Sequence, residues 1–294
     1  MLTTVPSTHA PVQGQPGVPT PRRRHYLMCP PTYFDVVYEI NPWMTAGALV
    51  DTAKAVAQWQ VLVDTYTDLG HTVELLDPQP SLPDMVYAAN GATSVGGRVL
   101  GATFATYERK PEASHHVAWH RENADRLGWR AVTESEHVNE AEGDFAVLGD
   151  LVLAGYGFRT DPRGHAELAD VVGMPVVSLR LVDERYYHLD TALGVLDDTP
   201  GRGNIAYYPK AFSEGSQEIL RRLFPEAVIA ADEDAEVLGL NFVSDGLNVM
   251  VPHRAEKLSA QLAERGYVPI QVDLSELLKG GGSVKCCTQE LRKA

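Results

Sequence analysis

A fixed order of elements recurs along this chain: a helix, a short strand and then a β-hairpin. Apolar residues at helical spacing predict the helices, and a glycine or proline lies close after the end of each. Pairs of turn residues such as Gly96-Gly97 and Asp245-Gly246 predict the hairpins. The predicted helices span residues 49–69, 112–127, 164–172, 216–223 and 254–264.

Each predicted helix is followed by a strand, and four of these strands by a hairpin. The predicted strands span 72–76, 130–133, 175–181, 227–231 and 267–272, and the hairpins 85–104, 145–153, 188–208 and 237–251. A last extended segment, Ser283–Cys287, lacks a hairpin partner, which a strand at Tyr26–Cys29 would supply by closing a ring. About five units of roughly 40–60 residues are typical of a repeat architecture. The sequence therefore predicts a ring of α/β units around one axis.

The ring is expected to form a single domain, residues 25–294. The chain of 294 residues is 44% hydrophobic and 22% charged, which is typical of a soluble globular protein with an ample core. Residues 1–24 are predicted to be a disordered tail, because the first 21 are rich in Pro, Thr, Gly and Gln and lack the features of a signal peptide. Arg22-Arg23-Arg24 is expected to form a solvated turn.

Charge and cysteine content argue against several classes of function. The formal net charge of −14 disfavours nucleic-acid binding and fits a site that attracts small cations. Three cysteines, an odd number, disfavour a disulfide framework and favour a reducing cytoplasm. The chain has no C-x-x-C or H-E-x-x-H motif and no aspartate/histidine cluster, so neither a metal nor another cofactor is expected. No apolar stretch approaches the length of a membrane span, so no membrane partner is expected.

Two adjacent cysteines, Cys286 and Cys287, lie in the run G-G-G-S-V-K-C-C-T near the C-terminus. Three glycines in a row allow backbone conformations closed to other residues and let a ligand come close. A cysteine thiolate is a strong nucleophile once a histidine lowers its pKa or takes its proton. One interpretation is therefore a catalytic nucleophile. The other is a pair of small buried hydrophobic side chains, since free cysteine is often fully buried.

Polar residues open three of the predicted hairpins, where a loop enters a buried strand and functional groups are usually displayed. They are Asp84 and Asn90 in the first hairpin, Glu140 or Glu142 in the second and His188 in the third. Carboxylates opposite a cysteine would bind a cation, and a planar guanidinium suits them best. Structural interpretations stay open: Asp84 as a turn former, Glu140 in a solvated loop and His188 as a core histidine.

Together these residues resemble the guanidino-group-modifying enzymes of the pentein superfamily, over residues about 25 to 290. This superfamily of five-bladed α/β-propellers includes arginine deiminase, agmatine deiminase, dimethylargininase, arginine dihydrolase and the amidinotransferases. The resemblance implies a single-domain, pseudo-symmetric α/β-propeller. The run G-G-G-S-V-K-C-x-T matches the catalytic-cysteine motif of the family, and its register selects Cys286 over Cys287 as the nucleophile.

Further motifs imply the rest of the catalytic set. His188 in H-L-D-T matches the catalytic histidine of the family, and Asp84 in P-D-x-V-[FY] matches an aspartate that grips the substrate. The E-G-G-D or E-G-x-G-D run of the family stands here as E-A-E-G-D. Its spacing favours Glu140 as the catalytic glutamate, with Glu142 as the alternative.

The resemblance also implies residues that bind the substrate. Arg159 in G-Y-G-F-R-T-D is expected to hold the α-carboxylate, and Arg109 in Y-E-R-K-P-E is a second candidate. Deiminases and dimethylargininases tend to carry a carboxylate where this chain has Asn90. That residue and Asn41 in I-N-P-W-M resemble the arginine dihydrolase branch, although both asparagines could equally be turn residues. A neutral amide can also bond a neutral ureido group, so such a site could keep citrulline for a second attack.

The implied activity is metal-independent hydrolysis of the guanidinium group of a small cationic amino acid, arginine or a methylated arginine. Cys286 attacks the guanidinium carbon, His188 protonates the leaving ammonia or amine, and water hydrolyses the S-alkylthiouronium intermediate. The sequence favours arginine dihydrolase, which gives ornithine, carbon dioxide and two ammonia. The alternative is dimethylargininase, which gives citrulline and dimethylamine. An amidinotransferase and a non-catalytic, ribosome-binding protein of this fold are further alternatives, and a homo-oligomer is left open.

Overall fold

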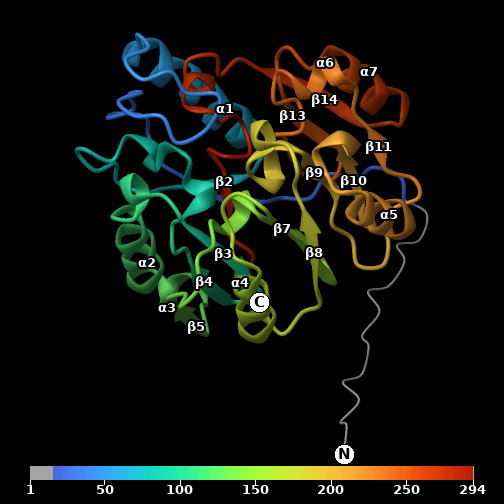
Figure 1. The fold of residues 1–294 in the computed structure, drawn as a ribbon, viewed down its shortest axis with the longest axis horizontal. Helices are drawn as coiled ribbons and strands as arrows, with labels where there is room; N and C mark the ends of the chain where they lie inside the picture. The colour runs from blue at the N-terminus through green and yellow to red at the C-terminus, as the bar shows by residue number, and fades with distance from the viewer. Residues whose placement is uncertain (1–15, 294) are drawn as a thin grey trace, which may run out of the picture.

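Five three-stranded sheets surround a common centre in the computed structural model, which describes residues 16–293 (Figure 1). Within that range the sheets have the orders β15-β1-β2, β3-β4-β5, β6-β7-β8, β9-β10-β11 and β12-β13-β14. In each sheet an antiparallel pair is extended by a third strand that lies parallel to the middle one. A helix precedes that third strand, and the helices lie on the outside of the ring (Figure 1). We call each sheet with its helix a blade.

The elements have the following bounds. The strands are β1 (His25–Met28), β2 (Thr72–Leu75), β3 (Ala92–Val95), β4 (Arg98–Gly101), β5 (Ala131–Thr133), β6 (Phe145–Leu148), β7 (Leu151–Tyr156), β8 (Val176–Arg180), β9 (Leu193–Asp197), β10 (Asn204–Tyr207), β11 (Val228–Ile229), β12 (Val243–Ser244), β13 (Asn248–Pro252), β14 (Val268–Val272) and β15 (Gln289–Glu290). The α-helices are α1 (Thr52–Asp68), α2 (Glu112–Glu122), α3 (Ala124–Leu127), α4 (Pro162–Val172), α5 (Glu214–Leu223), α6 (Asp232–Ala235) and α7 (Glu256–Glu264). No helix among residues 16–293 is long and apolar enough to cross a bilayer.

The predicted helices lie close to the observed ones because local signals fix their ends. The Asp51 carboxylate accepts the backbone N–H of Lys54 at the start of α1, and Gly173 ends α4 with φ +71°. One helix differs from its prediction. The segment predicted as residues 112–127 is broken at Asn123 into α2 and α3.

Helix α1 buries an apolar face that supports the centre of the ring. Ala55, Trp59, Leu62 and Tyr66 recur at helical spacing and are buried in one apolar cluster. Complete burial of a side chain the size of leucine contributes about 1.5–3 kcal/mol. The same cluster contains Cys286, so the packing of α1 also supports the segment that carries this thiol.

The ring is closed by pairing the N-terminal strand with the C-terminal one. Tyr26 of β1 lies opposite Glu290 of β15, in antiparallel register. The predicted extended segment Ser283–Cys287 is wrong, because these residues form a turn and only Gln289–Glu290 is a strand. In this turn the Cys287 N–H donates to the Ser283 carbonyl at 3.2 Å. Closure by the N-terminal strand itself is confirmed.

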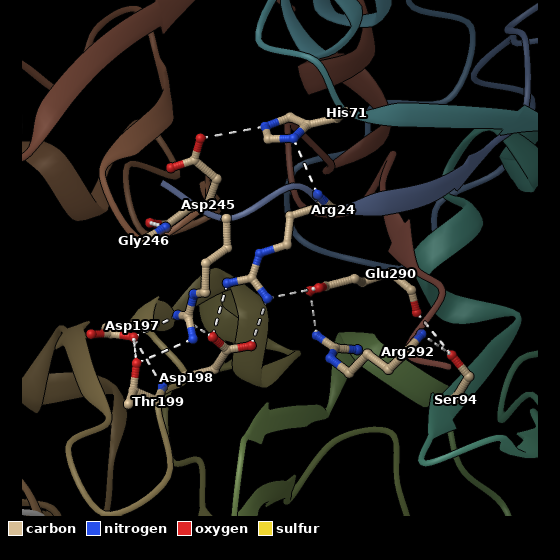
Figure 2. Close-up of polar contacts among 12 residues, drawn as sticks. Arg24, His71, Ser94, Asp197, Asp198, Thr199, Asp245, Gly246, Glu290 and Arg292 are labelled. Carbon is tan, nitrogen blue, oxygen red and sulfur yellow. Dashed lines mark hydrogen bonds and ion pairs between the residues drawn. The ribbon is translucent and has the colours of Figure 1, made fainter. Parts of the chain in front are cut away.

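Ion pairs strengthen this closure (Figure 2). Arg24 donates to both carboxylate oxygens of Asp198, at 2.7 and 2.8 Å, and to Glu290 at 3.1 Å. Arg22 pairs with Asp197 at 2.6 Å, and Arg292 bonds the second oxygen of Glu290 at 2.8 Å. Arg22 and Arg24 thus join the N-terminal segment to parts of the chain that are distant in the sequence.

The arginines were expected to lie in a solvated turn at the end of a disordered tail, which is wrong for Arg22 and Arg24. The backbone N–H groups of Thr20 and Arg22 also donate to the Gly246 and Asp245 carbonyls, at 3.0 and 2.9 Å. Residues 20–24 are therefore part of the folded structure. The first 15 residues of the predicted tail lie outside the described residues.

Two buried histidines of α2 should make the stability of the fold depend on pH. Burial lowers the pKa of His116 to about 3 and that of His120 to about 4. The unfolded chain has a histidine pKa of about 6.5, so below that pH it binds more protons than the folded protein does. The free energy of unfolding is therefore highest above pH ~6.5. It falls by about 1.4 kcal/mol per pH unit for each buried histidine as the pH drops toward 4.

The measurement is urea unfolding of the protein and of His116→Gln at pH 7, 6 and 5. We expect the pH slope of the unfolding free energy to be shallower in the variant. The matched control is His253→Gln, because the His253 side chain is 40% exposed. An unchanged slope in His116→Gln would show that this histidine is not kept neutral by the fold.

Candidate active site

Short turns at the centre of the ring carry the predicted site residues. A turn comes directly before the first hairpin strand in each of three blades: Ala88–Asn90 before β3, Ala141–Gly143 before β6 and Leu189–Thr191 before β9. The turn that carries Cys286 precedes β15 in the same way. Because the blades surround one axis, these turns bring residues far apart in the sequence together.

Cys286 is buried, with 2% of its surface exposed, and its thiol lies between two polar side chains. The thiol donates to Asp190 Oδ2 at 3.3 Å, and Asn241 Nδ2 donates to the sulfur at 3.1 Å. Burial, reinforced by the Asp190 carboxylate, raises the pKa of Cys286 well above its ordinary value. The Cys286 thiol is therefore protonated in these surroundings.

His188, Glu140 and Arg159 form a second buried group. His188 Nε2 lies 2.7 Å from Glu140 Oε2, and Arg159 Nη1 lies 3.0 Å from the same oxygen. Burial would raise the pKa of Glu140, but Arg159 and then His188 outweigh it and hold that pKa far below its usual range. Because Glu140 is ionised, His188 Nε2 carries the hydrogen of this bond. His188 Nδ1 is buried and has no hydrogen-bond partner within residues 16–293.

The structure separates the two glutamates of the E-A-E-G-D run. Ala141 between them has φ +47°, and the two carboxylates enter different networks. Glu140 meets His188, whereas Glu142 pairs with Lys285 at 2.8 Å and with Arg292 at 2.6 Å. Geometry thus favours Glu140 over Glu142 as the partner of the histidine.

Asp84 presents one free carboxylate oxygen at the centre. Its Oδ2 accepts from the Tyr38 hydroxyl at 3.0 Å, and its Oδ1 is buried without a partner in the described part of the chain. Burial is the main influence and raises the pKa of Asp84. The charges of Arg109 and Arg159 oppose this rise, and the charge of Glu140 adds to it. An unpaired carboxylate oxygen in such surroundings is suited to accept from a cationic ligand.

Asn90 and Arg109 form a buried pair that a carboxylate supports. Arg109 donates to both Glu112 oxygens, at 3.0 and 2.8 Å, and its Nη1 donates to Asn90 Oδ1 at 2.7 Å. A further bond runs to the Asp84 carbonyl at 3.2 Å. Arg109 is therefore largely occupied, which weakens its candidacy for the α-carboxylate. Since arginine can only donate, Asn90 must turn its oxygen to Arg109 and its NH2 toward the Glu140 carbonyl, 3.5 Å away.

Residues 29–51, between β1 and α1, form a covering segment over these groups: the Tyr38 hydroxyl bonds Asp84, and the Ile40 carbonyl bonds Arg159. Asn41 lies in it, and its amide donates to the Gly280 carbonyl at 3.1 Å and accepts from the Trp43 N–H at 2.9 Å. The Trp43 indole donates to the Arg185 carbonyl at 2.7 Å, and Arg159 Nη2 bonds the Ile40 carbonyl. Asn41 thus joins the covering segment to the glycine run, and direct contact with substrate stays a prediction.

The glycine run is needed because aromatic and amide groups pack on it. A Cβ on Gly281, whose φ is +84°, would lie 2.5 Å from Asn41 Oδ1, and one on Gly282 would lie 2.3 Å from the Tyr87 ring. The Tyr187 hydroxyl also donates to the Gly281 carbonyl at 2.9 Å. These contacts fix the path of the chain into the Cys286 turn.

Sequence analysis missed two residues, Asp190 and Asn241, which both contact the Cys286 sulfur. Asp190 belongs to the H-L-D-T motif but was not assigned a role. Asn241 lies directly before the first hairpin strand of the fourth unit, β12, at the position compared in the other four units. Extending that comparison to the fourth unit would have found it.

The described residues offer no metal site. Across residues 16–293, no group of three or more His, Cys, Asp or Glu side chains is placed to hold a metal ion.

Comparison with known proteins identifies the family. No family model matches the chain. The N(G),N(G)-dimethylarginine dimethylaminohydrolase of Mycobacterium tuberculosis is 54% identical to it over 278 residues, 95% of this chain and 89% of the relative. The chain belongs to the guanidine-modifying enzymes of the pentein superfamily. The predicted family, the five-bladed α/β-propeller and the class of hydrolase acting on guanidino C–N bonds are thereby confirmed.

More distant pentein relatives agree with this assignment. The bifunctional arginine dihydrolase/ornithine cyclodeaminase ArgZ of Synechocystis is 36% identical over 265 residues, 89% of this chain but 37% of ArgZ. The solved N-terminal domain of ArgZ, a cysteine-to-serine variant bound to substrate, has a TM-score of 0.84 at 34% identity, covering 92% of this chain and 98% of that domain. A dimethylarginine dimethylaminohydrolase with an S-methyl-L-thiocitrulline adduct has a TM-score of 0.75 at 20% identity and supports the fold alone.

Proposed function

We propose that this pentein enzyme is a dimethylargininase, which hydrolyses dimethylarginine to citrulline and dimethylamine. The observation that carries the proposal is the 54% identity, over 95% of the chain, to the dimethylarginine dimethylaminohydrolase of Mycobacterium tuberculosis. Identity to ArgZ is 36%. The sequence analysis favoured arginine dihydrolase, and the comparisons support its alternative better.

The proposed first half-reaction forms the covalent intermediate. The Cys286 proton passes to His188, and the thiolate attacks the guanidinium carbon. The C–N bond to dimethylamine breaks, and His188 returns the proton to the departing nitrogen. An S-alkylthiouronium cation is left on Cys286. Two contacts support the role of His188: its Nε2 is held by ionised Glu140 at 2.7 Å, and its Nδ1 is unpartnered in the part of the chain described here.

The second half-reaction regenerates the thiol. His188 takes a proton from water as the oxygen attacks the thiouronium carbon, and the C–S bond breaks to leave the ureido group of citrulline. The sulfur leaves as a thiolate and recovers a proton from His188. The remaining proton of the cationic intermediate is released, so that one water is consumed and dimethylammonium and citrulline are formed.

Binding of the amino acid is proposed to use Asp84 and Arg159. The free Oδ1 of Asp84 would accept from the guanidinium, and Arg159 would hold the α-carboxylate. Arg159 is favoured over Arg109, because it bonds a carboxylate through Nη1 alone, whereas Nε, Nη1 and Nη2 of Arg109 are all bonded to protein groups. Arg159 is bonded to Glu140 and to the Ile40 carbonyl, which places its guanidinium between the catalytic glutamate proposed here and residues 29–51.

Arginine dihydrolase is the second candidate function, and the orientation of Asn90 favours it. Arg109 holds the Asn90 oxygen at 2.7 Å, so the NH2 group is left as a donor, and its bond in this structure is a long one, 3.5 Å to the Glu140 carbonyl. A guanidinium offers no acceptor to that group, whereas the carbonyl of a neutral ureido group does. Asn90 would therefore help to retain citrulline for a second hydrolysis.

Product analysis by mass spectrometry distinguishes these activities. The enzyme is incubated with dimethylarginine, arginine, agmatine or citrulline, in the presence of a chelator, with Cys286→Ser as the control. We expect citrulline and dimethylamine from dimethylarginine, with no effect of the chelator. Ornithine from arginine would replace the proposal by arginine dihydrolase, and no turnover of any substrate would overturn both.

A further inference from the structure

We propose that Asn241 is a positioning residue for the nucleophile: it fixes the turn that carries Cys286 and stabilises the thiolate by donating a hydrogen bond to the sulfur. The proposal rests on the proposed function, in which Cys286 is the attacking group. It adds a fifth blade, that of β12–β14, to a site built so far from the other four. Asn241 is fully buried, at 0% exposure.

The Asn241 side chain fixes the Cys286 turn through its oxygen. Oδ1 accepts the backbone N–H groups of Lys285 and Cys286, at 3.0 and 3.1 Å. The Asn241 backbone carbonyl also accepts from the Lys285 N–H at 3.1 Å. These bonds occupy N–H groups that a strand would otherwise use, which explains why the segment before β15 turns instead of extending.

The same bonds determine which way the amide faces. Backbone N–H groups can only donate, so the atom facing Lys285 and Cys286 must be the oxygen. The NH2 group is then directed at the Cys286 sulfur and the Asp190 carbonyl, both 3.1 Å away. The oxygen thus accepts two hydrogen bonds and the NH2 group donates two. A flipped amide would place its NH2 group against two N–H donors and would lose all four bonds.

Asn241 and Asp190 act on the thiol in opposite directions. The thiol donates its hydrogen to Asp190 Oδ2, and the nearby negative charge disfavours a thiolate. The N–H of Asn241 favours the thiolate, because a donor bonds a charged sulfur more strongly than a neutral one. Other titratable groups whose charges couple to Cys286 are Cys287, Tyr87 and Tyr187. Burial and Asp190 oppose ionisation of Cys286, and the Ser283 backbone favours it. Asn241 is the uncharged side chain that donates to the sulfur and so favours the thiolate.

The test follows ionisation of Cys286 without any substrate. The ultraviolet absorbance of the thiolate is titrated against pH in the wild type, Asn241→Ala and Asn241→Asp. From each spectrum we subtract that of the same protein with Cys286→Ser added. The difference leaves out the absorbance of the other cysteines and of the tyrosines. We expect the midpoint for Cys286 to rise in Asn241→Ala by about one pH unit or more, and further in Asn241→Asp, which keeps the turn-fixing oxygen but adds a charge.

Asn204→Asp is the matched control, because Asn204 is a buried asparagine in β10 whose oxygen accepts the Ile205 N–H. This control variant should leave the Cys286 midpoint unchanged. Thermal unfolding checks that each variant folds. An unchanged midpoint in a folded Asn241→Ala would overturn the proposal, because a merely structural role would lower stability or kcat without shifting the titration. A shifted midpoint together with a wild type that turns over no guanidine substrate would instead support the role of Asn241 and refute the proposed function.

Discussion

Replacing Cys286 by serine should lower kcat on every guanidine substrate by about ten-thousandfold or more, the scale of loss found when an enzyme's nucleophile is removed. A serine hydroxyl at this position would be buried and would face the Asp190 carboxylate, and nothing beside it would lower its pKa enough to form an alkoxide. Steady-state kinetics on dimethylarginine give the loss. Mass spectrometry of the wild type quenched during turnover should show the thiouronium adduct on the peptide that contains Cys286.

Cys287→Ser is the matched control, because it makes the same atomic change one residue away. Cys287 is fully buried, and burial raises its pKa to a value well above the ordinary range. It has no bond to Asp190 or Asn241, so we expect kcat to change less than about tenfold. An inactive Cys287→Ser beside an active Cys286→Ser would mean that the register of the cysteine motif has been assigned wrongly.

Glu140→Gln should have the second largest effect and lower kcat by about 10²- to 10⁴-fold, the usual contribution of general acid–base catalysis. The variant removes the charge that holds His188 at 2.7 Å, and with it the preference for a hydrogen on Nε2. It also leaves the Arg159 guanidinium, whose side chain is 6% exposed, without its carboxylate. Breaking a buried ion pair costs about 3–5 kcal/mol, so unfolding must be measured together with kcat.

Glu142→Gln separates the catalytic effect from the structural one. Glu142 is as buried as Glu140 and pairs with two cations, Lys285 and Arg292, so its loss should also destabilise the fold. It has no bond to His188, and we expect kcat to fall by less than about tenfold. The assignment of Glu140 is refuted if the two variants lose kcat equally or if Glu142→Gln loses more.

The architecture was accessible from sequence because its signals are local. Helical periodicity and caps such as Asp51 and Gly173 fix the helices, and turn residues such as Gly96-Gly97 fix the hairpins. The Ser283–Cys287 turn was missed because its cause is not local. The backbone N–H groups of Lys285 and Cys286 are taken by a side chain 44 and 45 positions away in the sequence.

Roles within the site were less accessible, because they depend on partners that spacing does not show. Glu140 and Glu142 are two residues apart, and motif spacing favoured the first without excluding the second; in the structure Glu140 contacts His188. Arg109 matched a substrate-binding position, but Glu112 and Asn90 occupy its guanidinium. The preference between dimethylarginine and arginine was inferred from Asn41 and Asn90. Both of these residues bond to protein groups, so their identity alone does not define the substrate.

Closure of the ring has a consequence for synthesis on the ribosome. Arg24 and Glu290, which pair across the closure, are 266 positions apart, so β1 is translated long before its partner β15. During elongation one edge of β1 has no strand beside it, and exposed edges promote association between nascent chains. Cys286, the proposed nucleophile, is translated late as well, in the same segment that supplies β15. Premature termination before residue 286 would therefore release a ring that is both open and inert, and such fragments are expected to aggregate or be degraded.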